Sequence, residues 1–235
     1  PRSQALAQVF VMQLPNDILV VIPARAGSQR IKDKNLIKIK NKTLIEYSFG
    51  IIKDLKIEKQ TYVTTDSLKI FNISKKYSLN CIKRPKNISK NKSKIEEALL
   101  HLLNNKMVHN YYKWILLMQP TSPLREKKTI LKAIDLLKKN EKKIDTIISF
   151  TETREDFWEK RNSYYKRSND KLPRRQQDRK LRFYENGLIY IIRIENFKKT
   201  KKIYSNRNLG IITDKIESID INTMEDVKLL KKIIK

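Results

Sequence analysis

Residues Ile18 to Asn35 read ILVVIPARAGSQRIKDKN, and the rest of the chain is organised around this stretch. Its first five residues are apolar, and a continuous apolar run suits a strand inside a parallel sheet that is covered on both faces. Pro23 ends the run, because proline lacks the N–H that a neighbouring strand would bind. Gly27 then allows a sharp turn of the backbone. The pattern predicts a buried strand that passes abruptly into a polar loop.

The loop after this strand concentrates groups that bind anions. It carries Arg25, Ser28, Arg30 and Lys34 within ten residues. In an open α/β sheet, ligands bind just beyond the carboxyl ends of the strands. Cations, a hydroxyl and backbone N–H groups at that place favour a cradle for a triphosphate. The alternative is a solvated basic loop, of which this chain has many.

The length of 235 residues and a hydrophobic content of 40% fit one domain, or one domain with an excursion. No stretch approaches the ~20 apolar residues of a membrane span. Residues 1–16 do not have the pattern of a signal peptide. We expect them to form an N-terminal extension, with Met12 as a natural start and Pro1–Val11 of engineered or upstream origin.

The single cysteine, Cys81, excludes a disulfide within the chain and any multi-cysteine zinc site. Two histidines, His101 and His109, exclude a histidine-rich metal site, and the helical pattern around His101 favours a packing role. A reducing, cytoplasmic location fits this composition best.

The net charge is +27, from 52 Lys+Arg against 25 Asp+Glu. Such a balance first suggests binding to nucleic acid, because clustered cations release counterions from phosphates. The lysines are, however, spread evenly from Lys32 to Lys235, and no RNA-recognition signature or zinc finger is present. We attribute the excess to the codon bias of an AT-rich genome and expect neither a nucleic-acid nor a membrane partner.

Beyond the first loop, segments with strand and helix periodicity alternate, which predicts βαβ units and a mostly parallel sheet. Right-handed crossovers would place the loops at Arg25, Asp66 and Gln119 along one edge. Neither GxGxxG nor GxxxxGK[ST] occurs, so a dinucleotide fold and a Walker ATPase are unsupported. We expect strands at 61–66, 81–83, 114–118 and 145–150, and helices at 43–55, 68–78, 93–107 and 126–139.

The alternation of strand and helix patterns stops at residues 151–182, which are rich in aromatic and arginine residues. Thirty structureless residues inside a compact domain would be unusual, so we expect an excursion that packs on a second subunit. After it, Asn186-Gly187 is expected to open a strand at 188–193, and a short strand at 217–220 to precede a helix capped by Thr223.

The order and spacing of the short motifs resemble the sugar-acid cytidylyltransferases, and most closely the CMP-N-acylneuraminate synthetases. The similarity spans about Ile18 to Leu230. Its motifs are IPARxGSxRxxxKN at 22–35, Val63-Thr64-Thr65-Asp66, Arg84-Pro85, QPTSPLR at 119–125, Arg175-Gln176, NGxIY at 186–190 and Asp220-Ile221-Asn222-Thr223.

The resemblance implies a three-layer, Rossmann-like α/β nucleotidyltransferase fold with a mostly parallel, mixed sheet. Residues 17–235 would form a single domain, with 151–182 as a protruding dimerisation arm of a homodimer. The implied reaction couples CTP to a nonulosonic acid of the N-acetylneuraminate, legionaminate or pseudaminate type, with Mg2+ as cofactor, and releases pyrophosphate. The alternatives are a CMP-octulosonate synthetase, another sugar nucleotidyltransferase, or a basic nucleotide- or nucleic-acid-binding relative.

The resemblance also implies roles for particular residues. Arg25, Lys34 and Asp220 would be catalytic, the two cations by balancing charge on the leaving group. Mg2+ would be held by Asp220 and Asn222. The nucleotide would be bound by Ala24, Arg25, Gly27, Ser28, Arg30, Lys34, Asn35, Thr65, Arg84 and Ser93. The sugar acid would be bound by Gln119, Thr121, Ser122, Arg175, Gln176 and Asn186.

Each role has a plainer alternative. Arg25 and Lys34 could be surface cations, Asp220 a helix cap, and Arg175 a dimer contact only. The chain also departs from the pattern of this family. Asn222 stands where many relatives have a second aspartate, so one negative charge is lost at the expected metal site. Gln29 stands where a lysine often follows the loop serine.

Overall fold

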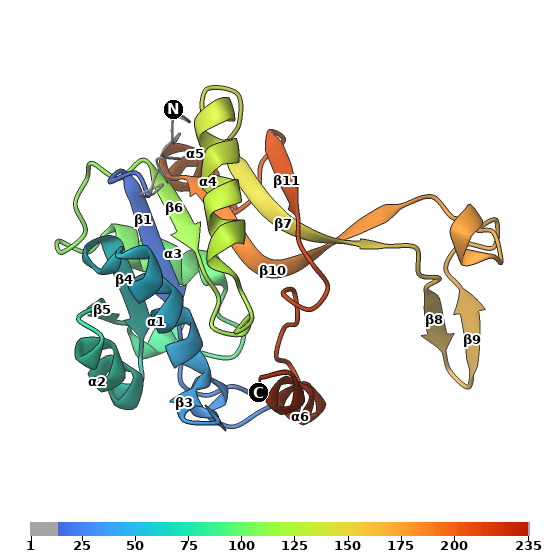
Figure 1. Ribbon diagram of the computed structural model, residues 1–235, viewed down its shortest axis with the longest axis horizontal. Helices are drawn as coiled ribbons and strands as arrows, with labels where there is room; N and C mark the ends of the chain where they lie inside the picture. Colours follow the sequence, from blue (N-terminus) through green and yellow to red (C-terminus); the bar gives the residue numbers. More distant parts are fainter. Residues whose placement is uncertain (1–13, 235) are drawn as a thin grey trace, which may run out of the picture.

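The computed structural model describes residues 14–234, so most of the expected N-terminal extension, residues 1–13, lies outside the described residues. One sheet of seven strands forms the centre, in the order β11-β7-β10-β6-β1-β4-β5 (Figure 1). Its strands are β1 Ile18–Pro23, β4 Thr61–Thr65, β5 Asn80–Lys83, β6 Trp114–Leu117, β7 Thr146–Thr153, β10 Arg182–Arg193 and β11 Asn208–Ile212.

Helices cover both faces of this sheet, because its central strands are apolar on both sides. Val20 and Ile22 pack with residues of α1, α2 and α4 on one face. Leu19 and Val21 pack with α3 and α5 on the other. The helices are α1 Leu44–Leu55, α2 Leu68–Lys76, α3 Ile95–Leu103, α4 Lys127–Asn140, α5 Ile194–Thr200 and α6 Met224–Ile233. The result is the three-layer α/β arrangement that the sequence predicts.

The direction of the strands brings four loops to one edge. Strands β1, β4, β5 and β6 pair in parallel, whereas β10 runs antiparallel to both β6 and β7. Tyr190 of β10 therefore lies beside the carboxyl end of β6, and the amino-terminal half of β10 extends beyond that end. Strand β11 pairs in parallel with β7, so the loop that follows it starts from the same edge. The mixed, mostly parallel sheet is confirmed.

Local signals account for the helix starts. The Glu46 carboxylate accepts hydrogen bonds from the Thr43 N–H (2.7 Å) and hydroxyl (2.6 Å) and so caps α1. The Ser67 hydroxyl accepts the Ile70 N–H at the start of α2. At α6, the Thr223 hydroxyl and the Asp226 carboxylate accept each other's backbone N–H, as the sequence predicts.

Two strand predictions are wrong. Strand β10 begins at Arg182 rather than at Leu188, because its first part pairs with β7 in a ribbon that has no core beneath it and hence no apolar pattern. The strand predicted at 217–220 does not form: residues 215–218 make a turn and 219–220 are irregular, and the Glu217 carboxylate binds the Glu126 N–H and the Thr129 hydroxyl.

The segment 151–182 projects from the body of the molecule (Figure 1). Strands β7 and β10 leave the sheet as a ribbon that ends in a hairpin of β8 (Trp158–Arg161) and β9 (Tyr164–Arg167). A further small pair, β2 (Lys38–Ile39) and β3 (Lys42–Thr43), packs near α6. Within residues 14–234, every helix is too short or too polar to span a bilayer.

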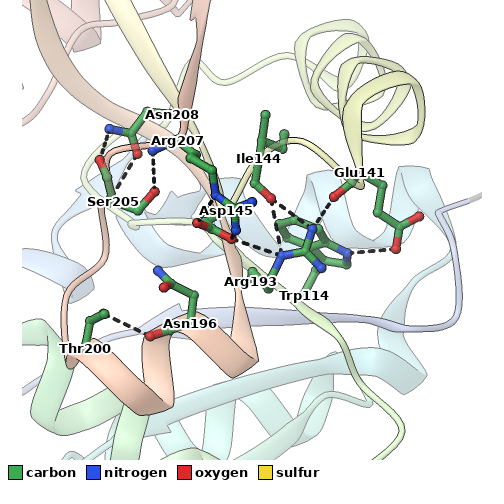
Figure 2. Close-up of polar contacts among 10 residues, drawn as sticks. All are labelled: Trp114, Glu141, Ile144, Asp145, Arg193, Asn196, Thr200, Ser205, Arg207 and Asn208. Carbon is green, nitrogen blue, oxygen red and sulfur yellow. Dashed lines mark hydrogen bonds and ion pairs between the residues drawn. The ribbon is translucent and has the colours of Figure 1, made fainter.

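Asp145 joins three strands at the edge opposite the loops (Figure 2). Its carboxylate, 5% exposed, accepts two hydrogen bonds from Arg207 (2.6 and 2.9 Å) and lies 3.2 Å from Arg193 Nε. The Arg193 guanidinium in turn lies 4.2 Å from the centre of the Trp114 ring. The cluster ties the starts of β7 and β11 to the end of β10.

We expect Asp145→Ala to lower the free energy of unfolding by about 3 kcal/mol, because it leaves two arginines without their buried carboxylate. Urea denaturation measures this. The control is Asp135→Ala, which breaks the exposed pair with Lys139 and should cost less than about 0.5 kcal/mol. Equal losses in the two variants would contradict this account of the cluster.

Candidate active site

Two cavities lie at the carboxyl edge of the sheet and share Gln119 and Asn222. The first, of about 380 Å³, is formed by the loop after β1, the turn after β6 and the loop before α6. Its lining residues are Pro23, Arg25, Ser28, Gln29, Arg30, Ile31, Lys34, Asn35, Gln119, Pro120, Thr121 and Asn222. Three cations and no carboxylate among them make this first cavity suited to an anion.

The loop after β1 is held by bonds to its neighbours. The Ala26 N–H donates to the Asp66 carboxylate at 2.7 Å, which joins the ends of β1 and β4. Asn35 Nδ2 donates to the Arg25 carbonyl at 3.2 Å across the loop. Arg25 itself donates to the Gly27 carbonyl (2.9 Å) and to Asn91 Oδ1 (2.8 Å). The Arg25 guanidinium is thus oriented before any ligand binds.

Three loops meet at the peptide groups on either side of Ile221. The Ile221 N–H donates to the Thr121 carbonyl at 2.8 Å, and Lys34 Nζ donates to the Ile221 carbonyl at 2.7 Å. The Ile221 side chain is fully buried in a small core with α6. Residues more than 180 positions apart are therefore fixed against one another.

Lys34 begins a short 3-10 turn and is half-buried. Burial lowers the pKa of its ammonium group, and the nearby charge of Asp220 acts in the opposite direction. A desolvated ammonium has lost part of its hydration, so it interacts more strongly with an anion than an exposed lysine does. This distinguishes Lys34 from the many surface lysines of the chain.

The second cavity, of about 400 Å³, lies on the side of β10. Its lining residues are Gln119, Tyr184, Glu185, Asn186, Gly187, Tyr190, Ser218, Asp220 and Asn222. Asn186 is buried and shapes this wall, because its amide donates to the Thr151 and Thr213 hydroxyls (2.8 and 2.7 Å). Tyr190 donates to the Glu185 carboxylate. Among the described residues that line this second cavity there is no lysine or arginine.

Asp220 lines the second cavity, two residues before Asn222, which both cavities share. Asn222 Nδ2 donates to its Oδ2 at 2.5 Å, whereas its Oδ1 is buried and has no hydrogen-bond partner. An unpartnered carboxylate oxygen of this kind fits a hard cation. No cluster of three or more His, Cys, Asp and Glu side chains that could hold a metal occurs within residues 14–234. A metal here would thus have a single carboxylate ligand from the described chain, which suits Mg2+ when phosphate oxygens supply further ligands.

A family model described as Cytidylyltransferase matches residues 19–234. The chain belongs to the cytidylyltransferase family. The family predicted from the motifs is thereby confirmed.

Relatives of known name agree with this family. The chain is 28% identical to the N-acylneuraminate cytidylyltransferase of Escherichia coli, over 90% of this chain but 51% of that protein. It is also 28% identical to the CMP-N,N'-diacetyllegionaminic acid synthase of Legionella pneumophila, over 92% and 96% of the two chains. The chain thus spans about half the length of the E. coli relative.

Solved structures agree on the fold. A CMP:2-keto-3-deoxy-manno-octonic acid synthetase complexed with CTP superposes with a TM-score of 0.64 at 14% identity, over 92% of this chain and 98% of that one. At this level of identity the likeness concerns the fold alone. It supports the Rossmann-like nucleotidyltransferase arrangement predicted from the sequence.

Most of the predicted binding residues lie in or beside the two cavities. Arg84 is buried directly after β5, where its guanidinium donates to the Thr64 hydroxyl and carbonyl. Thr65 Oγ1 accepts the Ser67 N–H, and Ser93 Oγ accepts the Lys90 N–H. Ser122 is buried, and its hydroxyl has no partner. The lining does not include these four residues.

Two predicted sugar ligands lie elsewhere in the same chain. Arg175 and Gln176 belong to the arm, where Arg175 is exposed beside Asp178 and Gln176 donates to Glu155. Neither lines the first or the second cavity of its own chain. Their role in binding stays a prediction that depends on a second copy of the chain.

The second cavity is also lined by residues for which no role was predicted, namely Tyr184, Glu185, Tyr190 and Ser218. The motifs shared with the family could have identified Tyr190, and also Asp66, which supports the loop after β1, because both residues lie within these motifs. For Tyr184 and Glu185 there was no such signal. They reach the cavity because β10 starts earlier than its apolar pattern indicates.

We expect Asp66→Ala to weaken binding of a triphosphate ligand in the first cavity about tenfold, because the Ala26 N–H loses its acceptor and the loop loses its support. Asp66→Asn is the matched control. It keeps an oxygen that can accept the bond and should stay within about threefold of the wild type. Isothermal titration calorimetry measures both, and an equal loss in the two variants would point to charge instead of loop support.

Proposed function

We propose that this chain transfers CMP from CTP to a nine-carbon 2-keto-3-deoxy sugar acid of the N-acetylneuraminate, legionaminate or pseudaminate type. The observation that carries this proposal is the pair of adjoining cavities that share Gln119 and Asn222, with Asp220 in the wall of the second. One is cationic and suits a triphosphate, and the other offers hydroxyl, amide and carboxylate groups that suit a polyhydroxylated sugar. The names of the relatives support a nonulosonic acid as the substrate. A cytoplasmic location stays a prediction.

The first cavity provides what displacement at a phosphate requires. In the proposed step, the anomeric hydroxyl oxygen forms a bond to the α-phosphorus and passes its proton to solvent water, while the bond from this phosphorus to the β-phosphate bridging oxygen breaks. Pyrophosphate leaves with the electron pair. Arg25 and Lys34 would balance the negative charge that develops on pyrophosphate. Asn35 would contact the cytosine edge with the amide oxygen that its bond to Arg25 does not use.

Asp220, with Asn222 beside it, would hold Mg2+ through the unpartnered carboxylate oxygen. Bound there, the metal would neutralise phosphate charge and orient the triphosphate. Gln119, on the wall shared by both cavities, would orient the sugar towards the α-phosphorus. Such reactions depend mainly on positioning, and the cross-linked loops around Ile221 supply it.

The direct test is release of pyrophosphate from CTP and Mg2+ across a panel of sugar acids. The panel contains N-acetylneuraminate, legionaminate, pseudaminate and octulosonate types, with ATP, GTP and UTP as nucleotide controls. Release with CTP and one nonulosonic acid is the expected result. Release with octulosonate alone would show that the substrate is an eight-carbon sugar acid and not a nonulosonic acid. No release with any sugar acid, together with no effect of CTP on the melting temperature, would overturn the proposal.

We expect Asp220→Ala to reduce Mg2+-dependent turnover at least about a hundredfold without unfolding the protein, because it removes the carboxylate that would bind the metal. Glu225→Ala is the control, since it removes an exposed carboxylate on α6. Asn222→Asp should leave activity unchanged or lower the Mg2+ concentration for half-maximal rate. Full turnover of Asp220→Ala would place the metal elsewhere.

We also propose a homodimer in which the arm of one subunit closes the sugar site of the other. The second cavity needs a cation for the carboxylate of the sugar, and none of its described lining residues provides one. The arm carries exposed arginines, among them Arg175, and exposed aromatic residues such as Trp158 and Tyr165. A two-stranded hairpin is marginal by itself, so a surface that covers it would stabilise it.

We expect replacement of residues 155–180 by a short glycine-serine turn to give a monomer in light scattering and to abolish saturation by the sugar. The turn can close because Thr153 and Arg182 are paired across the ribbon. In the full-length chain, Arg175→Ala should raise the KM for the sugar about tenfold. The matched control, Arg161→Ala at the hairpin, should not raise it. An active monomer would contradict the shared site.

A further inference from the structure

The last residue of the motif at 119–125, Arg125, has no assigned role, although it is 3% exposed. Its guanidinium makes three hydrogen bonds, to the Leu188 carbonyl (Nε, 2.9 Å), the Gln119 carbonyl (Nη2, 2.8 Å) and the Ser48 hydroxyl (Nη1, 3.4 Å). None of the ion pairs found within residues 14–234 includes Arg125. It is thus a buried cation bound to neutral acceptors.

Burial of the Arg125 charge without a carboxylate partner costs free energy of folding, because a buried charge is normally stabilised by an opposite one. Burial lowers the pKa of Arg125 to about 10, and the charge of Glu217 opposes this shift. Arg193, the last residue of β10, offers a contrast. Its guanidinium also donates to backbone carbonyls, those of Glu141 and Ile144, but it is neutralised by Asp145 (Figure 2).

The position of Arg125 shows which backbone groups its guanidinium holds together. Strands β6 and β10 are paired up to Leu117 and Tyr190, where the ladder ends. In the continued antiparallel register, Gln119 and Leu188 stand opposite each other. Their carbonyls are both acceptors and cannot bond to one another. The edge of the guanidinium that carries Nε and Nη2 presents two parallel donors and bonds one carbonyl on each side.

This is also the place where β10 leaves its regular pairing with β7. The register shifts between Glu185 and Tyr190, and Gly187 has a φ of +74° within the shifted segment. A Cβ at Gly187 would lie 3.6 Å from Gln119 Nε2, so the two walls of the second cavity nearly meet here. The spacing of these walls therefore depends on the group that bridges them.

We propose that Arg125 is a positioning residue for the sugar acid. Its guanidinium holds the Gln119 and Leu188 carbonyls at a set distance and thereby fixes the mouth of the second cavity between Gln119 and Gly187. Arg125 does not touch the substrate and acts through these two wall residues. The inference rests on the proposed function, because it assigns the second cavity to the sugar.

The test compares Arg125→Lys and Arg125→Gln with the wild type in the pyrophosphate assay. Lysine keeps the charge but replaces the two-nitrogen fork by one nitrogen. Glutamine removes the buried charge, which favours folding, and keeps one donor group. Both variants should raise the KM for the sugar acid about tenfold while the KM for CTP stays within twofold. Circular dichroism and thermal melting establish that each variant is folded.

The matched control is Arg193→Lys, which changes an arginine that also bonds two carbonyls but lies at the far end of β10. It should lower the melting temperature and leave both KM values within twofold. A change in the melting temperature is expected in all three variants and does not distinguish them. The KM for the sugar acid does, because the proposed role raises it in the two Arg125 variants and not in Arg193→Lys.

Two results would overturn the assignment alone in an active wild-type enzyme. One is a folded Arg125 variant whose two KM values are unchanged or rise equally. The other is failure of both Arg125 variants to fold, which would make Arg125 a residue of the fold. A wild type that releases no pyrophosphate with any sugar acid would instead overturn the proposed function, and this assignment with it.

Discussion

The hydrogen bonds on either side of Ile221 are the constraint on which the site depends. Its N–H is bound by the Thr121 carbonyl and its carbonyl by Lys34. These bonds join the loops after β1 and β6 to the segment that carries Asp220. Because the Ile221 side chain is buried with α6, the junction is also anchored in a core. Rigid placement of groups from distant parts of the chain is what an in-line displacement requires.

Charge is distributed unevenly across this junction. The first cavity is lined by three cations, whereas the lining of the second includes Glu185 and Asp220. The two requirements of the proposed reaction, neutralisation of a triphosphate and alignment of a sugar, are thus separated in space. The net charge of +27 does not explain this pattern, because most of its lysines lie on surfaces away from both cavities. Lys34 differs from them by its burial and by its bond to Ile221.

The antiparallel strand β10 provides most of the residues that line the second cavity. Its amino-terminal half runs back along the edge where the parallel strands end, and its irregular segment at Asn186 and Gly187 faces Gln119. The same strand continues outward into the arm (Figure 1). The site and the arm are therefore joined by one strand, so a subunit that bound the arm would also influence the wall of the cavity.

Local signals in the sequence predicted the parallel strands β1, β4, β5 and β6, the helices other than α5, and the family, because buried strands, capping residues and motif spacing can all be recognised without the fold. The sequence also indicated the loops at Arg25, Asp66 and Gln119. The predictions from the sequence were wrong where pairing with another strand or a distant side-chain contact, and not the local apolar pattern, determines the backbone conformation. Strand β10 forms from polar residues because β7 pairs with it, and the segment at Glu217 stays irregular because its carboxylate caps α4. The convergence at Ile221 and the place of Arg125 were decided by tertiary structure, since no local pattern encodes contacts between residues so distant in the chain.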